Sequence, residues 1–214
     1  MSARDSLLNQ FRKPSGWLGR WNARDMNRRH SELTDWGLGH VSIGSRSAIL
    51  DVGCGGGRTV QKLAAIAGEG TVCGIDYSEA SVAVSRKNNR KSIRQGRVEI
   101  RQGSVSQLPY GDSVFDLVTA VETHYYWPDL PASVREVLRV LKSGGAFVII
   151  AEAYKGGKYD GRNQLFAQAM QPLGFSHLSL SEHEELLSQA GYADVQVLED
   201  YEKGWMCAMG KKTS

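Results

Sequence analysis

Cysteine is scarce in this chain, and long hydrophobic runs are missing from it. Only three cysteines occur among 214 residues, at Cys54, Cys73 and Cys207, and no two of them form a C-x-x-C pair. The sequence therefore predicts neither a disulfide framework nor a zinc site, and we expect no metal centre. No apolar run approaches the roughly 18–20 residues that cross a membrane. Because the opening residues MSARDSLLNQ also lack the apolar stretch of a secretory signal, we expect a cytoplasmic protein.

A strong excess of charge of either sign is also missing. The formal net charge is +3, and the shares of hydrophobic residues (41%) and charged residues (23%) are those of an ordinary globular protein. Basic side chains nevertheless gather in residues 1–46 and again between Arg86 and Arg101. Either group could contact a polyanion. No aromatic residue interleaves the second group, as a stacking surface for bases would require, so we interpret that group as a solvated face.

Apolar strands alternate with amphipathic helices from Ser47 onward. Strands are expected at residues 49–52, 71–76, 98–102, 114–121, 146–151, 194–198 and 204–210. Helices are expected at residues 60–67, 78–94, around 134–141, at 163–170, and before Gly191, where Ser181-x-x-Glu184 has the pattern of a capping box. This alternation predicts one α/β domain built on a doubly wound sheet, and the length suits a single core.

Two segments do not follow this alternation. Residues 1–46 contain three of the five tryptophans among charges and glycines, and we expect them to form an N-terminal helical arm or lid over a domain formed by residues 47–214. Residues 152–180 are rich in glycine and tyrosine, and we expect them to form a lid insertion.

The chain is organised around Ala48 to Arg58, which reads AILDVGCGGGR. A strand that enters a glycine turn and leaves as a helix brings a ligand against bare main chain and the N–H groups of the helix. A dinucleotide fingerprint would need a glycine where Arg58 stands. The carboxylate of Asp51 would repel a pyrophosphate, whereas a ligand that carries an ammonium and a sulfonium would gain from it.

This stretch resembles motif I of the class I S-adenosylmethionine-dependent methyltransferases, (apolar)-(apolar)-D/E-x-G-x-G-x-G, at every defined position. The run from Ser106 to Asp116 resembles that family's approach to its fourth strand. The segment from Val121 to Asp129 resembles the h-h-W-x-D segment of the ubiquinone-biosynthesis type. The resemblance, to a methyltransferase domain of type 11, covers residues 47 to about 152. It implies a seven-stranded Rossmann-like sheet of order 3-2-1-4-5-7-6 with an antiparallel last strand, and S-adenosylmethionine as cofactor.

The same resemblance assigns cofactor contacts to the glycine turn and to the strand ends. Asp76 ends the second strand and would accept hydrogen bonds from both ribose hydroxyls. Ser104 and Val105 would meet the adenine, although the family commonly has an acid where Ser104 stands, which weakens that assignment. The expected cofactor-binding residues are Asp51, Gly53, Cys54, Gly55, Gly57, Asp76, Tyr77, Ser104, Val105 and Glu122.

Aromatic and titratable residues after the fourth strand indicate the acceptor side. Aromatic faces next to a sulfonium give cation–π stabilisation, although packing on the next helix is an equally good explanation for them. His124 is a candidate general base for an oxygen, nitrogen or carbon acceptor, and His30 on the N-terminal helix is its rival. The expected substrate-pocket residues are Met26, Asn27, Tyr125, Trp127 and Tyr154.

The sequence thus predicts methyl transfer from S-adenosylmethionine to a small, partly apolar molecule by a monomer or homodimer. A nucleic-acid substrate is not expected, because the fourth strand leads neither to a D/N-P-P-Y/F tetrad nor to a P-C nucleophile. Three alternatives stay open. They are a nicotinamide oxidoreductase, a non-catalytic module that binds the cofactor to regulate a partner, and a tRNA or rRNA methyltransferase that uses the basic N-terminal arm.

Overall fold

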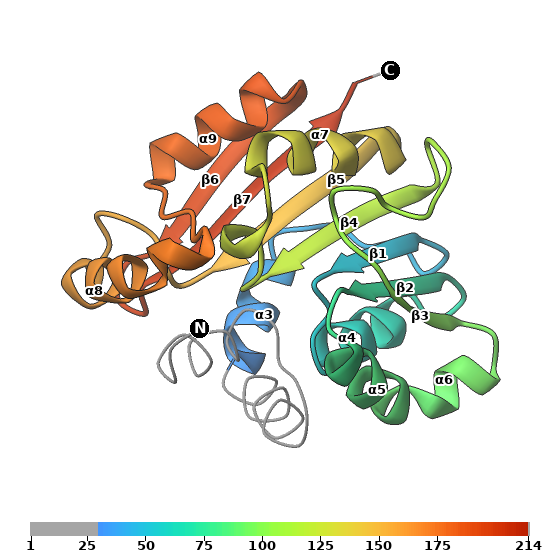
Figure 1. The fold of residues 1–214 in the computed structure, drawn as a ribbon. Helices are drawn as coiled ribbons and strands as arrows, with labels where there is room; N and C mark the ends of the chain where they lie inside the picture. Colours follow the sequence, from blue (N-terminus) through green and yellow to red (C-terminus); the bar gives the residue numbers. More distant parts are fainter. Residues whose placement is uncertain (1–29, 214) are drawn as a thin grey trace.

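The computed structural model describes residues 30–213, and these form one α/β domain around a seven-stranded sheet (Figure 1). The strands are β1 (Ala48–Val52), β2 (Thr71–Asp76), β3 (Val98–Gln102), β4 (Phe115–Val121), β5 (Leu141–Ala151), β6 (Tyr192–Asp200) and β7 (Trp205–Lys212). Their order is β3-β2-β1-β4-β5-β7-β6. The first five strands pair in parallel, and β7 is antiparallel to both of its neighbours. The predicted fold class, strand order and antiparallel last strand are confirmed.

Helices cover both faces of the sheet (Figure 1). They are α3 (Ser31–Leu38), α4 (Arg58–Ile66), α5 (Glu79–Asn88), α6 (Arg90–Arg94), α7 (Leu130–Val140), α8 (Asp160–Met170) and α9 (Leu180–Gln189), with short 3-10 turns η1 (His124–Tyr126) and η2 (Gln171–Leu173). Alternate residues of one strand serve opposite faces. Ile49 belongs to the core cluster that includes residues of α3 and α4, whereas Leu50 belongs to the cluster that includes residues of α7 and α9. A strand buried on both faces therefore has the continuous apolar sequence that predicted it.

Several predicted element boundaries differ from those of the structure, and three of the differences have a clear local cause. The helix expected over residues 78–94 is divided at Asn89, whose side-chain amide donates hydrogen bonds to the Ser85 and Gly57 carbonyls. Such bonds from a side chain to the main chain compete with helix propagation. Strand β5 begins at Leu141 rather than at residue 146. Residues 142–145, which were expected only to end the preceding helix, belong to this strand, and a register shift between β4 and β5 accommodates them.

The capping box of α9 is formed by Ser179 and Glu182, not by Ser181 and Glu184. The Ser179 hydroxyl accepts from the Glu182 N–H at 3.2 Å, and the Glu182 carboxylate accepts from the Ser179 N–H at 2.7 Å. Both serines satisfy the pattern S-x-x-E. The earlier start is used because it places Leu180 against the core.

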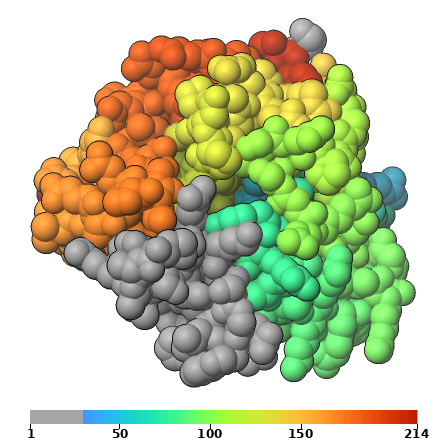
Figure 2. Space-filling model, in the orientation of Figure 1, coloured from blue at the N-terminus to red at the C-terminus, as the bar shows by residue number. Residues whose placement is uncertain are grey.

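The part of the N-terminal arm that the structure describes packs onto the sheet. Leu33 and Leu38 of α3 are buried, and a side chain at Gly37 would come within 2.5 Å of Ile150 in β5. Residues 1–29, with Met26 and Asn27, lie outside the described residues. The segment that contains α8 (orange) forms one side of the molecule, opposite the segment of α5 and α6 (green), as Figures 1 and 2 show. Among residues 30–213, no helix has the length and apolar character needed to cross a membrane.

Candidate active site

The glycine turn leads from the end of β1 into α4. Gly53, Gly55 and Gly57 have φ angles of +74°, +50° and +78°, which side chains rarely adopt. A Cβ on Gly53 would lie 2.0 Å from the Thr123 hydroxyl oxygen. A Cβ on Gly57 would lie 2.2 Å from the Ser85 hydroxyl oxygen. A Cβ on Gly55 would meet only one main-chain oxygen, at 4.0 Å, so this glycine leaves the main chain open to the space above the turn.

A cavity of about 210 Å³ lies above this turn, at the carboxyl ends of β1, β2 and β4. Every residue that the sequence predicts to bind the cofactor, except Gly57, lines it. Sequence reasoning missed Thr34, Arg58, Thr123 and Tyr126, which line it too. Ligands of open α/β sheets bind at this edge, where strands on either side of a topological switch diverge.

Two buried carboxylates flank the turn inside the cavity. Asp51 is 2% exposed and accepts a hydrogen bond from the Thr119 hydroxyl at 2.8 Å. Asp76 is 8% exposed and accepts from the Gly55 N–H at 2.9 Å and from the Ser78 N–H at 2.8 Å. Burial raises the pKa of both, that of Asp51 to about 7 although the Thr119 bond opposes the shift. A cationic or hydroxyl-bearing ligand suits such a site, whereas a pyrophosphate does not.

The raised pKa of Asp51 predicts a pH dependence of stability in the ligand-free protein. Its carboxyl has a pKa near 3.8 when unfolded and about 7 when folded, so the folded state holds the proton more tightly. Its contribution to the free energy of unfolding is therefore complete below about pH 3.8 and is lost as pH rises from there to about 7. We expect the isosteric Asp51→Asn variant to lose less stability than the parent across this range. Urea unfolding at a series of pH values measures the difference, with exposed Asp112→Asn as control; parallel curves for parent and Asp51→Asn would contradict the assignment.

The remaining predicted cofactor residues border the cavity, and they differ in burial and in hydrogen-bond partners. Val105 is buried in the core, and the Ser104 hydroxyl accepts from the Ser106 N–H at 3.2 Å. The Cys54 thiol is buried and lies 3.9 Å from the Ser85 hydroxyl. The Tyr77 carbonyl accepts from the Gln102 amide at 3.2 Å. This placement is compatible with the predicted contacts, and their roles stay predictions.

His124 does not line the cavity, whereas a general base would have to reach the acceptor there. It is buried, with its Nε2 2.9 Å from Nε2 of His183 on α9. Because Nδ1 of His183 lies 2.7 Å from the Ser179 carbonyl and must donate there, His183 accepts at Nε2 and His124 donates. Burial lowers the pKa of both imidazoles. The geometry assigns His124 to a buried pair that joins η1 to α9.

Two of the predicted pocket residues do not line the cavity. Tyr125 is buried and donates its hydroxyl hydrogen to Glu122, which does line the cavity, and Tyr154 donates to Glu199, which does not, at 2.7 Å. Trp127 lines the cavity, and so does His30. The structure thus brings His30 and Trp127 to the cavity together with the predicted cofactor residues. Tyr125 lies one hydrogen bond behind Glu122, and His124 and Tyr154 lie outside the cavity.

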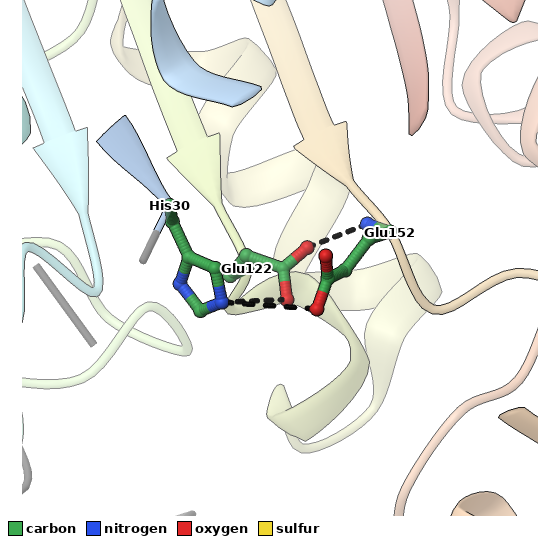
Figure 3. A group of neighbouring side chains, drawn as sticks. All are labelled: His30, Glu122 and Glu152. Carbon is green, nitrogen blue, oxygen red and sulfur yellow. Dashed lines mark hydrogen bonds and ion pairs between the residues drawn. The ribbon is translucent and has the colours of Figure 1, made fainter. Parts of the chain in front are cut away.

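His30, which lines the cavity, faces two carboxylates. Its Nε2 lies 3.9 Å from a carboxylate oxygen of Glu122 and 3.9 Å from one of Glu152 (Figure 3). Glu122 directly follows β4, and Glu152 directly follows β5. Burial raises the pKa of Glu122, which His30 opposes and Glu152 reinforces. Sequence reasoning missed Glu152, although it ends its apolar strand just as Glu122 does.

Known methyltransferases share this architecture. Residues 50–149 match the family described as a methyltransferase domain. Over 145 residues, which are 67% of this chain and 53% of the relative, the chain is 30% identical to the 27-O-demethylrifamycin SV methyltransferase of Amycolatopsis mediterranei (strain S699). The chain spans about half or less of the length of the curated relatives that it matches.

Two solved structures resemble the whole fold. The first is a complex between the Haloferax volcanii Trm112 methyltransferase activator and a methyltransferase, with a TM-score of 0.79, 19% identity, and coverage of 100% of this chain and 99% of that one. The second is human N-acetylserotonin methyltransferase in complex with S-adenosylmethionine, with a TM-score of 0.73, 15% identity, and coverage of 91% and 56%. The sheet order, the glycine turn at the cavity and these matches agree with the motif I resemblance. The chain belongs to the class I S-adenosylmethionine-dependent methyltransferases.

Proposed function

We propose that this protein transfers a methyl group from S-adenosylmethionine to a small, partly apolar molecule and releases S-adenosylhomocysteine. The observation that carries this proposal is one cavity lined by two groups of residues that differ in chemistry. Asp51, Asp76 and the open Gly55 form one group, here called the donor end, and His30 and Glu122 form the other, here called the acceptor end. The first group suits a ribose-bearing cation, and the second suits a group that must lose a proton.

The donor end is proposed to hold the cofactor through its carboxylates. Asp76 accepts hydrogen bonds from the ribose hydroxyls, while its bonds from Gly55 and Ser78 hold the carboxylate in place. Asp51 supplies negative charge beside the turn, where the ammonium and sulfonium of the cofactor gain from it. The cofactor itself supplies an electrophilic methyl group on its sulfonium. Trp127 at the cavity wall gives an aromatic face to that positive charge.

The acceptor end is proposed to align a small molecule in line with the methyl group and to take up its proton. Alignment supplies most of the rate, since it replaces an encounter by a fixed geometry. An oxygen or nitrogen acceptor must also lose a proton, and His30 is the imidazole in the cavity that can receive it. By their names, the rifamycin SV and N-acetylserotonin methyltransferases also act on small molecules.

RNA binding by the basic residues near α5 and α6 is disfavoured, because three of them already bind other groups of the chain. Arg86 donates two hydrogen bonds to the Ile100 carbonyl, and Arg97 donates to the Ala64 carbonyl at 2.9 Å. Arg101 pairs with Glu99 at 2.7 Å. Guanidinium groups engaged with the chain's own main chain and carboxylates offer less to phosphates than free ones do.

The proposal is tested by incubating the protein with a whole-cell extract, which contains both small molecules and RNA, and S-adenosylmethionine that carries a labelled methyl group. Mass spectrometry should find label in a small molecule together with an equal amount of S-adenosylhomocysteine. Label in RNA alone would support the tRNA or rRNA alternative. S-adenosylhomocysteine that binds in calorimetry while no label is transferred to any acceptor would support the regulatory module.

Replacement of His30 by alanine is expected to slow methyl transfer at least about a hundredfold, the lower limit of what general base catalysis contributes. Binding of S-adenosylhomocysteine should stay within about twofold of the parent, because the proposed ribose contacts are made by Asp76 and not by His30. Single-turnover transfer and calorimetry measure the two effects. The matched control is His40→Ala, an exposed imidazole that packs against Trp36. A His30→Ala enzyme with the parent's rate would remove His30 from the mechanism.

A further inference from the structure

Three residues from three different elements converge at the acceptor end of the cavity. They are His30 before α3, Glu122 after β4 and Glu152 after β5 (Figure 3). One ligand atom from each lies within 4.8 Å of the other two. We propose that His30, Glu122 and Glu152 bind a divalent metal ion there. The sequence predicted no metal site, because the three residues are far apart in the chain and form no short motif.

The spacing of the three atoms fits an ion. A triangle with two sides of 3.9 Å and a third side of at most 4.8 Å has a point equidistant from its corners. That point is about 2.1–2.5 Å from each corner, and bonds from nitrogen or oxygen to divalent ions are about 2.0–2.6 Å long. An ion at this point would touch the imidazole nitrogen and both carboxylates with small side-chain adjustments.

Neighbouring groups already orient the central ligand. The Tyr125 hydroxyl donates to one oxygen of Glu122, and the Glu152 N–H donates to the other at 2.6 Å. Each carboxylate oxygen accepts more than one bond, so both retain a lone pair. Hydrogen bonds of this kind, from groups behind a ligand, fix its orientation and raise metal affinity. The orientation of the Glu122 carboxylate is therefore fixed by hydrogen bonds, as that of a metal ligand usually is.

The charge balance of the cluster also calls for a cation. Two carboxylates face each other, and the Glu122 side chain is 8% exposed. Among the described residues that line the cavity, only Arg58 carries a fixed positive charge, and it stands at the glycine turn. A buried carboxylate is costly unless a proton or a cation compensates it.

A metal ion fits this cluster better than an ammonium group on the acceptor. Two acceptors that share one ammonium at about 2.9 Å stand about 4.7 Å apart, whereas two ligands of a small ion stand about 3.0–3.6 Å apart. The 3.9 Å separations are nearer to the second range. A neutral imidazole nitrogen is also a good metal ligand. Imidazole combined with carboxylates favours Mn²⁺, Fe²⁺ or Zn²⁺.

If methyl transfer proceeds as proposed above, an ion at this place would lower the pKa of an acceptor hydroxyl bound to it. His30 would then act as a metal ligand rather than as the base, with the same expected loss of rate on replacement. Binding of the ion does not depend on that step. It can be measured without any acceptor.

The test is calorimetric titration of the chelator-treated protein with Mn²⁺, repeated with Zn²⁺. We expect one ion per chain for at least one of the two metals. His30→Ala and Glu152→Gln should each raise its dissociation constant at least about tenfold. Glu152 is suited to replacement because its side chain is 38% exposed. The matched control is Glu99→Gln, which replaces an exposed carboxylate on β3 outside the cluster. This variant protein should bind the ion with the affinity of the parent.

Absence of saturable binding of both ions, or binding that survives both substitutions, would overturn the proposal. Thermal stabilisation by an organic ammonium salt that is lost in Glu152→Gln, without any metal binding, would assign the cluster to a cationic acceptor instead. S-adenosylhomocysteine binding is measured in the same samples. Its absence would count against the proposed function, whereas its presence without metal binding would count against the metal site alone.

Discussion

Replacement of Asp76 by alanine is expected to raise the dissociation constant for S-adenosylhomocysteine at least about a hundredfold. Two hydrogen bonds to a charged group contribute about 1.5–3 kcal/mol each, and about 1.4 kcal/mol is a factor of ten in affinity. The substitution also removes the acceptor for the Gly55 N–H and the Ser78 N–H, which loosens the glycine turn. Calorimetry on the purified variant measures the change.

The isosteric Asp76→Asn variant separates the charge from the shape of this side chain. Its amide oxygen can still accept one hydrogen bond, so we expect an intermediate loss of affinity. The exposed Asp112→Asn variant is the control, because its salt bridge to Arg139 lies outside the cavity. Asp76→Ala with the affinity of the parent would show that the cofactor does not use this carboxylate.

Replacement of Gly53 by alanine is expected to destabilise the fold by about 2–5 kcal/mol, the sum of backbone strain and overpacking. The residue has a φ of +74°, and the added Cβ would lie 2.0 Å from the Thr123 hydroxyl oxygen and 2.7 Å from the Thr123 Cβ. Thr123 follows Glu122 in the segment after β4, so the clash also disturbs the acceptor end of the cavity. Urea unfolding of the ligand-free variant measures the loss.

The Gly55→Ala variant is the informative comparison for this turn. Because Gly55 has a φ of +50°, an alanine there is expected to lower the free energy of unfolding by about 1–2 kcal/mol through backbone strain. The added Cβ would meet only one main-chain oxygen, at 4.0 Å. The added methyl group would stand in the cavity, so affinity for S-adenosylhomocysteine should fall more than about tenfold at modest cost to stability. Equal stability losses in both variants, with cofactor affinity unchanged in Gly55→Ala, would refute this division of roles within the turn.

The sequence was informative where chemistry depends on neighbours along the chain. The order strand, glycine turn, helix and the acid at position 51 predicted which edge of the sheet holds the site, because parallel strands share a carboxyl edge. The same locality explains the errors. Ser179 and Ser181 offer equivalent capping patterns, and only the packing of Leu180 against the core selects the first.

The sequence did not predict the directions of the side chains that follow β4. His124 and Glu122 follow the same strand two positions apart, yet Glu122 lines the cavity and His124 pairs with His183 behind it. The turn η1 decides this, since it ends the alternation that would have placed both on one side. No local pattern reveals that His183, on a helix far along the chain, would engage His124.

By itself, the sequence determined the alternation of strands and helices of an α/β sheet, the glycine turn at its edge and the preference for a cationic ligand beside Asp51. These features depend on apolar periodicity, on glycine at positive φ and on charge within a short stretch. The strand order and the ribose contact of Asp76 came from the resemblance to the methyltransferase family. Only the tertiary structure decided which titratable groups meet at the acceptor end. His30, Glu122 and Glu152 come from three elements, and the fold brings them together because β4 and β5 end side by side and α3 packs against that edge.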